Sequence, residues 1–374
     1  SFMLRLILSR LIQLPIILLV ILVVSFTMAW VMPGDPFNAE GAKKVDEATK
    51  RAMEERYNMA DGPVYFFGSY IKGIVTRADF GESTANSGRK VADIIKDGFP
   101  VSASLGLCAI AIGLLIGTTA GVLGALQAVS PFKSGSPALG LAVLLLPGLL
   151  LGGFFLLIGA HWIVIVLGLL AGAIVGGFGA FKPKETLDVG SMSITLIGIS
   201  LPSFVTGAIL LAVGASLTRL WIPDLTWLHF PLGGWSGPKS IVLPAIALGL
   251  APAAYVARLI RLGLADIMSS DFIRTARAKG LSHRDALFKH ALKVAFLPVL
   301  SFLGPAAASV MTGSFVVEKI FNIPGIGQEF VYAVQNKDQM VILGVVLVFA
   351  TMLIVFNLLV DLAYAWVDPR IELD

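Results

Sequence analysis

Long apolar runs fill most of this chain of 374 residues, and they restrict its fold more than any other feature. A helix that crosses a bilayer needs about 20 apolar residues, because each residue rises about 1.5 Å. Runs of that kind lie at approximately 11–32, 101–128, 138–158, 162–181, 189–217, 241–264, 294–316 and 340–366. Charged residues make up 14% of the chain, about half the share in an ordinary soluble domain. We therefore predict an all-α polytopic membrane protein with about eight spans.

The placement of lysine and arginine predicts that both termini are cytoplasmic. Short loops rich in these residues stay on the cytoplasmic side, and two arginines precede the first run. An even number of crossings returns the tail, 367–374, to the same side. The run within 1–32 is too long for a signal-peptide core, so it is predicted to be a retained anchor helix. On this path the segment 33–99 is external and the basic loop 265–293 is internal.

The external segment contains two candidate helices. Residues 40–57 follow a polar amphipathic pattern, and residues 64–75 form the second candidate. The second carries Tyr65, Phe66, Phe67 and Tyr70. Aromatic side chains of this kind are expected at the membrane interface or against a partner protein.

Several motifs with known chemistry are absent from the sequence. It has no G-x-x-x-x-G-K-[ST] phosphate loop, no H-E-x-x-H, no metal-spaced Cys/His cluster and no G-x-S-x-G elbow. We therefore expect no catalytic residue, no metal site and no cofactor in this chain. The net charge is only +4 and its basic residues lie beside apolar runs, so nucleic acid is not expected as a partner.

The internal basic loop contains residues that typically begin and end a short helix. The pattern predicts a helix over 272–279, with Ser270 or Asp271 as its N-cap and Gly280 just past its end. Ser282 then begins a capping box for the next helix. A helix of about two turns is marginal in water, so this one is expected to need a partner surface.

Short motifs in order along the chain resemble one family of transport proteins. R-T-A-R-A-K-G (274–280) resembles the EAA loop of ABC importer permeases, with Arg274 and Thr275 where the general pattern has Glu and Ala. The branch that it resembles is the oligopeptide/dipeptide/nickel one. The other motifs are M-P-G-D-P (32–36), A-D-F-G-E-S (78–83), S-L-P-S-F (200–204), T-G-S-F-V-V-E-K-I-F-N-I-P-G-I-G (312–327) and D-P-R-I (368–371).

The resemblance implies a six-span permease core that forms half of a translocation path for peptides or similar small solutes. It also implies a second homologous permease, two ATPase subunits that bind ATP and Mg, an extracytoplasmic binding protein, and a prokaryotic inner membrane. The EAA-like loop would couple to an ATPase. The coupling residues are then Arg274, Thr275, Ala276, Ala278, Lys279 and Gly280. On charge alone, the loop could equally be a basic loop that meets anionic lipid.

The count of spans exceeds the family core by two. The core, 100–366, would contain an additional hairpin at about 138–181, between the usual second and third spans. The hairpin has a glycine stripe at 168, 172 and 176, and the second span has one at 113, 117 and 121. Such stripes let helices approach closely, so the hairpin is expected to pack at the periphery.

Candidate residues of the translocation path are small or polar and lie at helix interruptions, where helix packing explains them equally well. They are Ser200, Pro202, Ser203, Thr312, Gly313, Ser314, Pro324 and Gly325. The loop 321–327 is either a gate that dips toward the path or an ordinary surface loop.

Two other classes of function stay open. An ion-coupled secondary transporter would act as a single chain and would need ionisable residues inside its spans. The runs 101–128, 138–158 and 189–217 contain none. A membrane enzyme would need a convergent catalytic set near one interface, and none is apparent.

Overall fold

The structure is a computed structural model, and its described residues fall into five ranges. They are 2–32, 46–86, 88–129, 201–220 and 231–367. Two compact units divide the chain, namely Ser1–Ser104 with Ser314–Leu359, and Leu105–Gly313 with Val360–Asp374. We call them unit 1 and unit 2 and describe each by itself.

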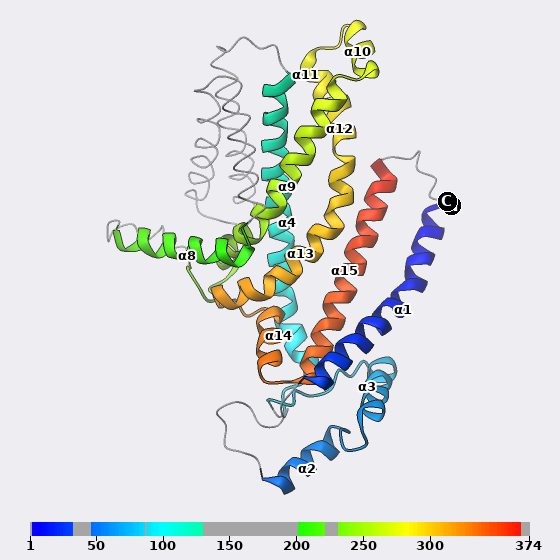
Figure 1. Ribbon diagram of the computed structural model, residues 1–374, viewed down its shortest axis with the longest axis vertical. Helices are drawn as coiled ribbons and strands as arrows, with labels where there is room; N and C mark the ends of the chain where they lie inside the picture. Colours follow the sequence, from blue (N-terminus) through cyan, green and yellow to red (C-terminus); the bar gives the residue numbers. More distant parts are fainter. Residues whose placement is uncertain (1, 33–45, 87, 130–200, 221–230, 368–374) are drawn as a thin grey trace. The chain divides into compact units, whose positions relative to one another are not determined.

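The described part of the chain is helical, and its long helices match most of the predicted spans (Figure 1). Helices long and apolar enough to cross a membrane are Leu8–Val31, Val91–Val122, Pro238–Met268 and Gln339–Tyr364. A bent pair, His283–Ala295 and Leu297–Met311, adds a fifth candidate with an angle of 44°. The runs 138–158 and 162–181 lie outside the described residues, so the count of eight spans stays a prediction.

Unit 1 contains the first helices of the chain together with segments from its end. Its elements are α1 (Phe2–Val31), α2 (Glu47–Arg56), α3 (Pro63–Arg77), the start of α4 (Val91–Val129), the end of α13 (Leu297–Phe321), α14 (Ile326–Gln335) and most of α15 (Gln339–Val367). Their buried side chains form one hydrophobic cluster that joins α1, α3, α4, α14 and α15. Residues from both ends of the chain thus share one core.

The aromatic residues of α3 correct one sequence-based expectation. Phe66 is fully buried and Tyr70 is 5% exposed, so unit 1 itself covers both side chains and neither faces lipid or a partner protein. Phe66 and Phe67 stack on Phe26 of α1, with ring centroids 5.7 and 4.8 Å apart. The periodicity of 64–75 marks an apolar face, but it does not say which surface covers that face. Tyr65 is 55% exposed.

Asp338 joins the beginning of α15 to the segment that follows α3. Its carboxylate accepts hydrogen bonds from the Ser83 hydroxyl, from Thr84 N at 3.2 Å and from Ala85 N at 3.3 Å. It also accepts from Val341 N at 3.2 Å, which is the usual role of an aspartate at a helix N-cap. Because Asp338 is 1% exposed, these donors replace the water that a buried carboxylate would otherwise need.

Unit 2 is built around α9. Its elements are α8 (Ser203–Leu220), η2 (Pro238–Ile241), α9 (Val242–Met268), α10 (Asp271–Ala278), α11 (His283–Asp285), the π-helical turn η3 (Ala286–Ala291), α12 (Leu292–Ala295), and parts of α4 and α13. A hydrophobic cluster extends from Val122 and Ala125 of α4 across α9 to Ile273 of α10. It attaches the short helix to the long ones.

Glycines bring α4 and α9 into close contact, as the stripe at 113, 117 and 121 predicts. A Cβ on Gly117 would lie 2.5 Å from the carbonyl oxygen of Ala253, and one on Gly121 would lie 2.7 Å from that of Ala257. Gly249 of α9 makes the same kind of approach to α4. No methyl group fits between the two helices, because real Cβ contacts are not that short. The stripe at 168, 172 and 176 lies outside the described residues.

Candidate functional site

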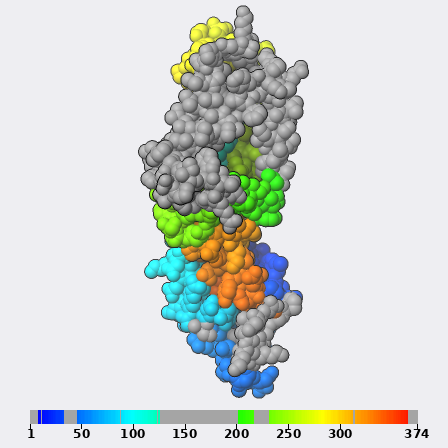
Figure 2. Space-filling model, turned by 90° about the vertical axis from the view of Figure 1, so that its left-hand side faces the viewer, coloured from blue at the N-terminus to red at the C-terminus, as the bar shows by residue number. Residues whose placement is uncertain are grey.

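The short helix predicted in the basic loop exists, and it lies at the surface of unit 2. The prediction for 272–279 corresponds to α10 (Asp271–Ala278), with Lys279 as its C-cap. In Figure 2 the atoms of this loop, yellow, lie on the surface. Ile273 is fully buried in the cluster of unit 2, so a single side chain anchors the helix. The rest of α10 is free to contact another molecule.

The residues predicted for ATPase coupling occupy that open surface. Arg274, Thr275, Ala278, Lys279 and Gly280 are exposed, and Ala276 is half-buried. The sequence-based set omitted two neighbours, Phe272 and Arg277, which are also exposed. Phe272 is 48% exposed beside the fully buried Ile273. An exposed phenylalanine among cations is typical of a protein contact surface, where aromatic and arginine side chains supply most of the affinity.

Turns at both ends hold α10 in place. Gly280 has φ +93°, a backbone conformation that strains residues with a side chain, and the N–H of Leu281 bonds to the Ala276 carbonyl at 3.2 Å. The Ser282 hydroxyl accepts from the N–H of Asp285 at 3.1 Å, which confirms the predicted cap. Ser270 is the N-cap of α10, as one of the two predicted candidates, but the side-chain capping bond is not made. Its hydroxyl donates instead to the Ile267 carbonyl of the preceding helix.

The chain breaks where the loop joins α13. α12 and α13 meet at an angle of 44°, one residue before the Leu297-Pro298 pair that the family pattern includes. Proline has no N–H, so Pro298 cannot continue the ladder of hydrogen bonds from α12. The bend separates the apolar helix α13 from the basic loop.

In unit 1, the loop 321–327 packs on a buried carboxylate. Glu318 of α13 is fully buried, and its carboxylate accepts from the Ser102 hydroxyl of α4 at 2.8 Å and from Gln328 N at 3.1 Å. The Ser102 oxygen in turn accepts from Ile326 N at 3.0 Å. The first N–H groups of α14 have no partners inside the helix. Glu318 accepts directly from the N–H of Gln328, and it is linked to the N–H of Ile326 through the Ser102 hydroxyl. One acidic side chain fastens the loop to two long helices.

The glycines Gly325 and Gly327 are required by the close approach of Glu318 more than by their backbone conformation. Gly325 is the N-cap of α14 with φ −96°, a value open to any residue. Gly327 was expected to interrupt a helix, but it lies inside α14. A Cβ on Gly327 would lie 2.8 Å from a Glu318 carboxylate oxygen and 2.9 Å from the Cα of Phe315. The glycines therefore let the loop lie directly on the carboxylate.

The remaining path candidates are divided between the two units. Ser200 lies outside the described residues, while Pro202 is exposed just before α8 and Ser203 is its first residue. Thr312 and Gly313 lie within α13, and Ser314 is 2% exposed. Pro324 is exposed and Gly325 is buried. A shared path that contains all of them stays a prediction.

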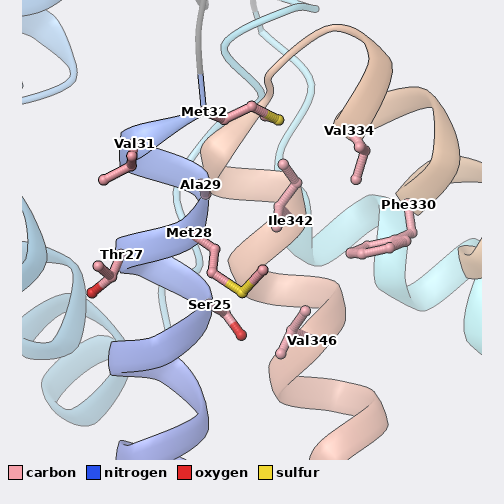
Figure 3. A pocket seen from close by; sticks show the side chains of 10 residues that line it. All are labelled: Ser25, Thr27, Met28, Ala29, Val31, Met32, Phe330, Val334, Ile342 and Val346. Atoms are coloured by element: carbon pink, nitrogen blue, oxygen red, sulfur yellow. The ribbon is translucent and has the colours of Figure 1, made fainter.

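A cavity of about 690 Å³ opens in unit 1 between α1, α14 and α15 (Figure 3). Its lining is apolar except for the hydroxyls of Ser25 and Thr27, and the Thr27 hydroxyl already donates to the Val23 carbonyl at 2.7 Å. In Figure 3 Met28 points from α1 toward Ile342 and Val346 of α15. A peptide has polar groups that this lining would leave without partners, so the cavity does not suit one.

Three ionisable residues inside apolar helices were missed by the sequence-based analysis. Arg258 and Arg261 lie in the apolar run 241–264, and Glu318 lies two residues past the run 294–316. The arginines could have been found, because charged residues inside a span are rare and usually functional. The role of Glu318 could not, because Ser102 is 216 residues away in the sequence.

These features define a polytopic helical membrane protein with an exposed, basic short helix, and its described part contains no group of residues that could hold a metal ion. The chain belongs to the family of binding-protein-dependent transport system inner membrane components, whose family pattern matches residues 164–373. The family pattern for the N-terminal part of such membrane components matches residues 3–106. The chain is therefore a transport component of a bacterial inner membrane.

Individual relatives match almost the whole length. The dipeptide transport system permease protein DppB of Bacillus subtilis is 35% identical over 356 residues, which are 95% of this chain and 94% of the relative. The oligopeptide transport system permease protein OppB of Salmonella typhimurium is 33% identical over 372 residues, 99% of this chain and 100% of the relative. OppB of Haemophilus influenzae is 31% identical over the same shares.

Proposed function

We propose that this chain is one of two permease subunits of an ATP-driven importer of peptides. The observation that carries the proposal is the match along nearly the entire chain to permease proteins of dipeptide and oligopeptide transport systems.

The proposal assigns the coupling role to α10. Its exposed face offers Phe272 and Arg274 together with Arg277, and a single buried residue, Ile273, fixes it to the membrane helices. A helix docked in this manner can transmit movement of an ATPase to α9, which precedes it in the chain, and to α11 and η3, which follow it. The energy source then lies in the two ATPase subunits, which bind ATP and Mg.

The proposal also includes a second, homologous permease and an extracytoplasmic binding protein. A path for a solute needs walls on all sides, and each permease supplies half of them. The alternative for α10 is a basic loop that meets anionic lipid. We favour a protein contact because Phe272 is exposed next to the buried Ile273, which fixes the helix to unit 2.

The test is co-purification followed by transport. The chain is expressed with the neighbouring reading frames of its operon, extracted in mild detergent, and the recovered proteins are identified by mass spectrometry. Recovery of two ATPases and a second permease is expected, as is ATP-dependent peptide uptake after reconstitution. Recovery of the chain alone, with uptake by it alone, would contradict the proposal and favour an ion-coupled transporter.

A matched pair of glycine variants tests the role assigned to α10. Gly280→Leu should strain the turn, which needs φ +93°, and should reduce ATPase recovery and uptake together. Gly234→Leu is the control, because Gly234 has φ +79° and equally open space but lies before η2, away from α10. Equal losses in both variants would indicate a general folding defect and would count against the coupling role.

A further inference from the structure

Two arginines lie inside the apolar helix α9, and they differ in their surroundings. Arg261 is half-buried and packs over α4, since a Cβ on Gly124 would lie 3.2 Å from its Cδ. Arg258 is exposed, and within the described ranges no hydrogen bond or ion pair reaches it. It lies inside the predicted apolar run 241–264, six residues before the end of that run, which is about 9 Å along the axis. An arginine at such a depth is costly unless it faces water or a partner group.

Arg258 lies on the face of α9 that turns away from α4. The buried side of the helix carries Val256, Ile260 and Leu264, all at most 1% exposed. The open side carries Tyr255, Arg258 and Leu262, at the spacing of successive turns. The guanidinium group therefore points out of unit 2.

An aromatic pair adjoins Arg258. The ring of Tyr255, one turn earlier on α9, stacks on Phe302 of α13, with centroids 4.4 Å apart and planes at 16°. Tyr255 is 41% exposed. On α13, Ser301 next to Phe302 and Pro305 one turn further are exposed as well. The open surface thus combines a cation, an aromatic pair and a hydroxyl group.

This composition differs from a surface that meets lipid. The exposed face of α1 carries Ile16, Val20 and Val24, all more than half exposed and all aliphatic. Lipid tails offer nothing to a guanidinium or a hydroxyl, and polar groups inside a bilayer usually face protein or a water-filled cavity. The α9–α13 surface therefore fits a wetted path better than hydrocarbon.

We propose that the α9–α13 surface borders the substrate path, and that Arg258 binds the C-terminal carboxylate of the peptide as it passes. This inference rests on the proposed peptide-import function. The planar guanidinium matches a carboxylate with two parallel hydrogen bonds. Every unmodified peptide has that carboxylate whatever its side chains. The flat pair of Tyr255 and Phe302 supplies an apolar surface for the neighbouring residue of the peptide.

The first test compares a peptide acid with its amide. Trialanine and trialanine amide are taken up by proteoliposomes that contain the complete transport complex. Arg258→Gln should slow trialanine uptake about tenfold, equivalent to about 1.4 kcal/mol, with less effect on the amide. Arg258→Lys, which keeps the charge but cannot make the two parallel hydrogen bonds, should restore only part of the rate. Arg261→Gln removes the same charge one turn away and should affect acid and amide alike.

Equal effects of Arg258→Gln on both peptides, or no effect on either, would overturn the inference. A defect that follows the fraction of anionic lipid in the vesicles would overturn it too and would indicate a lipid headgroup as the ligand. Absence of ATP-driven uptake by the wild-type complex is a different result, because it would contradict the proposed function itself.

The second test does not depend on transport of the amide. A benzoylphenylalanine photoprobe replaces Tyr255, and the same probe replaces Ile16 on the aliphatic face of α1 as a control. During ATP-driven turnover the probe at 255 should label radioactive trialanine, while the probe at 16 should label lipid. Labelling only of lipid or of the second permease from position 255 would contradict a path-lining surface.

Discussion

Glu318 connects three helices of unit 1. Its carboxylate is removed from water, and its donors are the hydroxyls of Ser102 and Ser314 and backbone N–H groups at the beginning of α14. A buried acceptor of this kind contributes little when all of its bonds are made, but its donors become costly once it is lost. The loop 321–327 is therefore held by one group that cannot be exchanged without consequence.

At this residue scale we predict that Glu318→Gln destabilises the protein by about 1–3 kcal/mol. The amide keeps one acceptor oxygen but turns an NH₂ group toward donors. The measurement is thermal unfolding in detergent of Glu318→Gln, Ser102→Ala and the double variant. Because the two side chains share one network, the double variant should lose less than the sum of the single losses. Strict additivity of the losses would show that the network is not coupled.

The residues around α10 and around Glu318 show how much could be predicted from the sequence at this scale. Gly280 and Ser282 act on neighbours within a few residues, so the turn and the cap around α10 were predictable from local rules. The position of Ser270 at the N-cap was also predictable, but the missing side-chain capping bond was not, because its hydroxyl donates to a carbonyl of the preceding helix. Glu318 and Arg258 depend on tertiary neighbours or on the face that a helix turns outward. Such information is absent from a local pattern.

At the scale of elements, the contact between α4 and α9 is the closest in unit 2. Gly117 and Gly121 of α4 and Gly249 of α9 leave backbone atoms of one helix against the other. Small residues at such a seam gain packing over a long contact, which replaces the hydrophobic drive that is missing within a bilayer. The stripe was readable from the sequence, but its partner helix was not, because spacing alone does not name the facing surface.

We predict that Gly117→Ala destabilises this seam by about 1–3 kcal/mol, because the added methyl group would overlap the Ala253 carbonyl and Val256. Gly106→Ala is the matched control on the same helix, since its nearest atom beyond the helix is 4.0 Å away on Val310. Thermal unfolding in detergent compares the two. A Gly106→Ala loss as large as that of Gly117→Ala would point to the general properties of glycine in α4 and away from the seam.

At the scale of the whole molecule, the arrangement across the membrane follows from the parity of spans. The four long apolar helices and the bent pair agree with the predicted runs, whereas the hairpin at about 138–181 lies outside the described residues. Two additional crossings leave every later loop on its original side. The prediction of a cytoplasmic C-terminus thus holds if the hairpin crosses twice or not at all, and it fails if the segment crosses once.

We predict that deletion of 137–183 leaves the remaining topology unchanged. Cys108 is the only cysteine, so Cys108→Ser provides a background for single cysteines placed at Ala60 or Arg284, both exposed. An impermeant maleimide should label position 60 from outside and position 284 only after the membrane is opened, with and without the hairpin. Loss of outside labelling at position 60 would contradict the predicted orientation of the first span, and outside labelling of position 284 in either chain would show that the predicted parity is wrong.

The hydrogen bonds between Asp338 and the segment that follows α3 also have a consequence during biosynthesis. Ser83 and Asp338 are separated by 255 residues, so at about 5–20 residues per second the ribosome delivers the carboxylate roughly 10–50 s after the hydroxyl. Until then the segment around Ser83 and Thr84 lacks its buried acceptor. Unit 1 therefore reaches its native hydrogen bonding only after nearly all of the polypeptide has been made, and nascent chains that stop early expose an unfinished core to the proteases of the cell envelope.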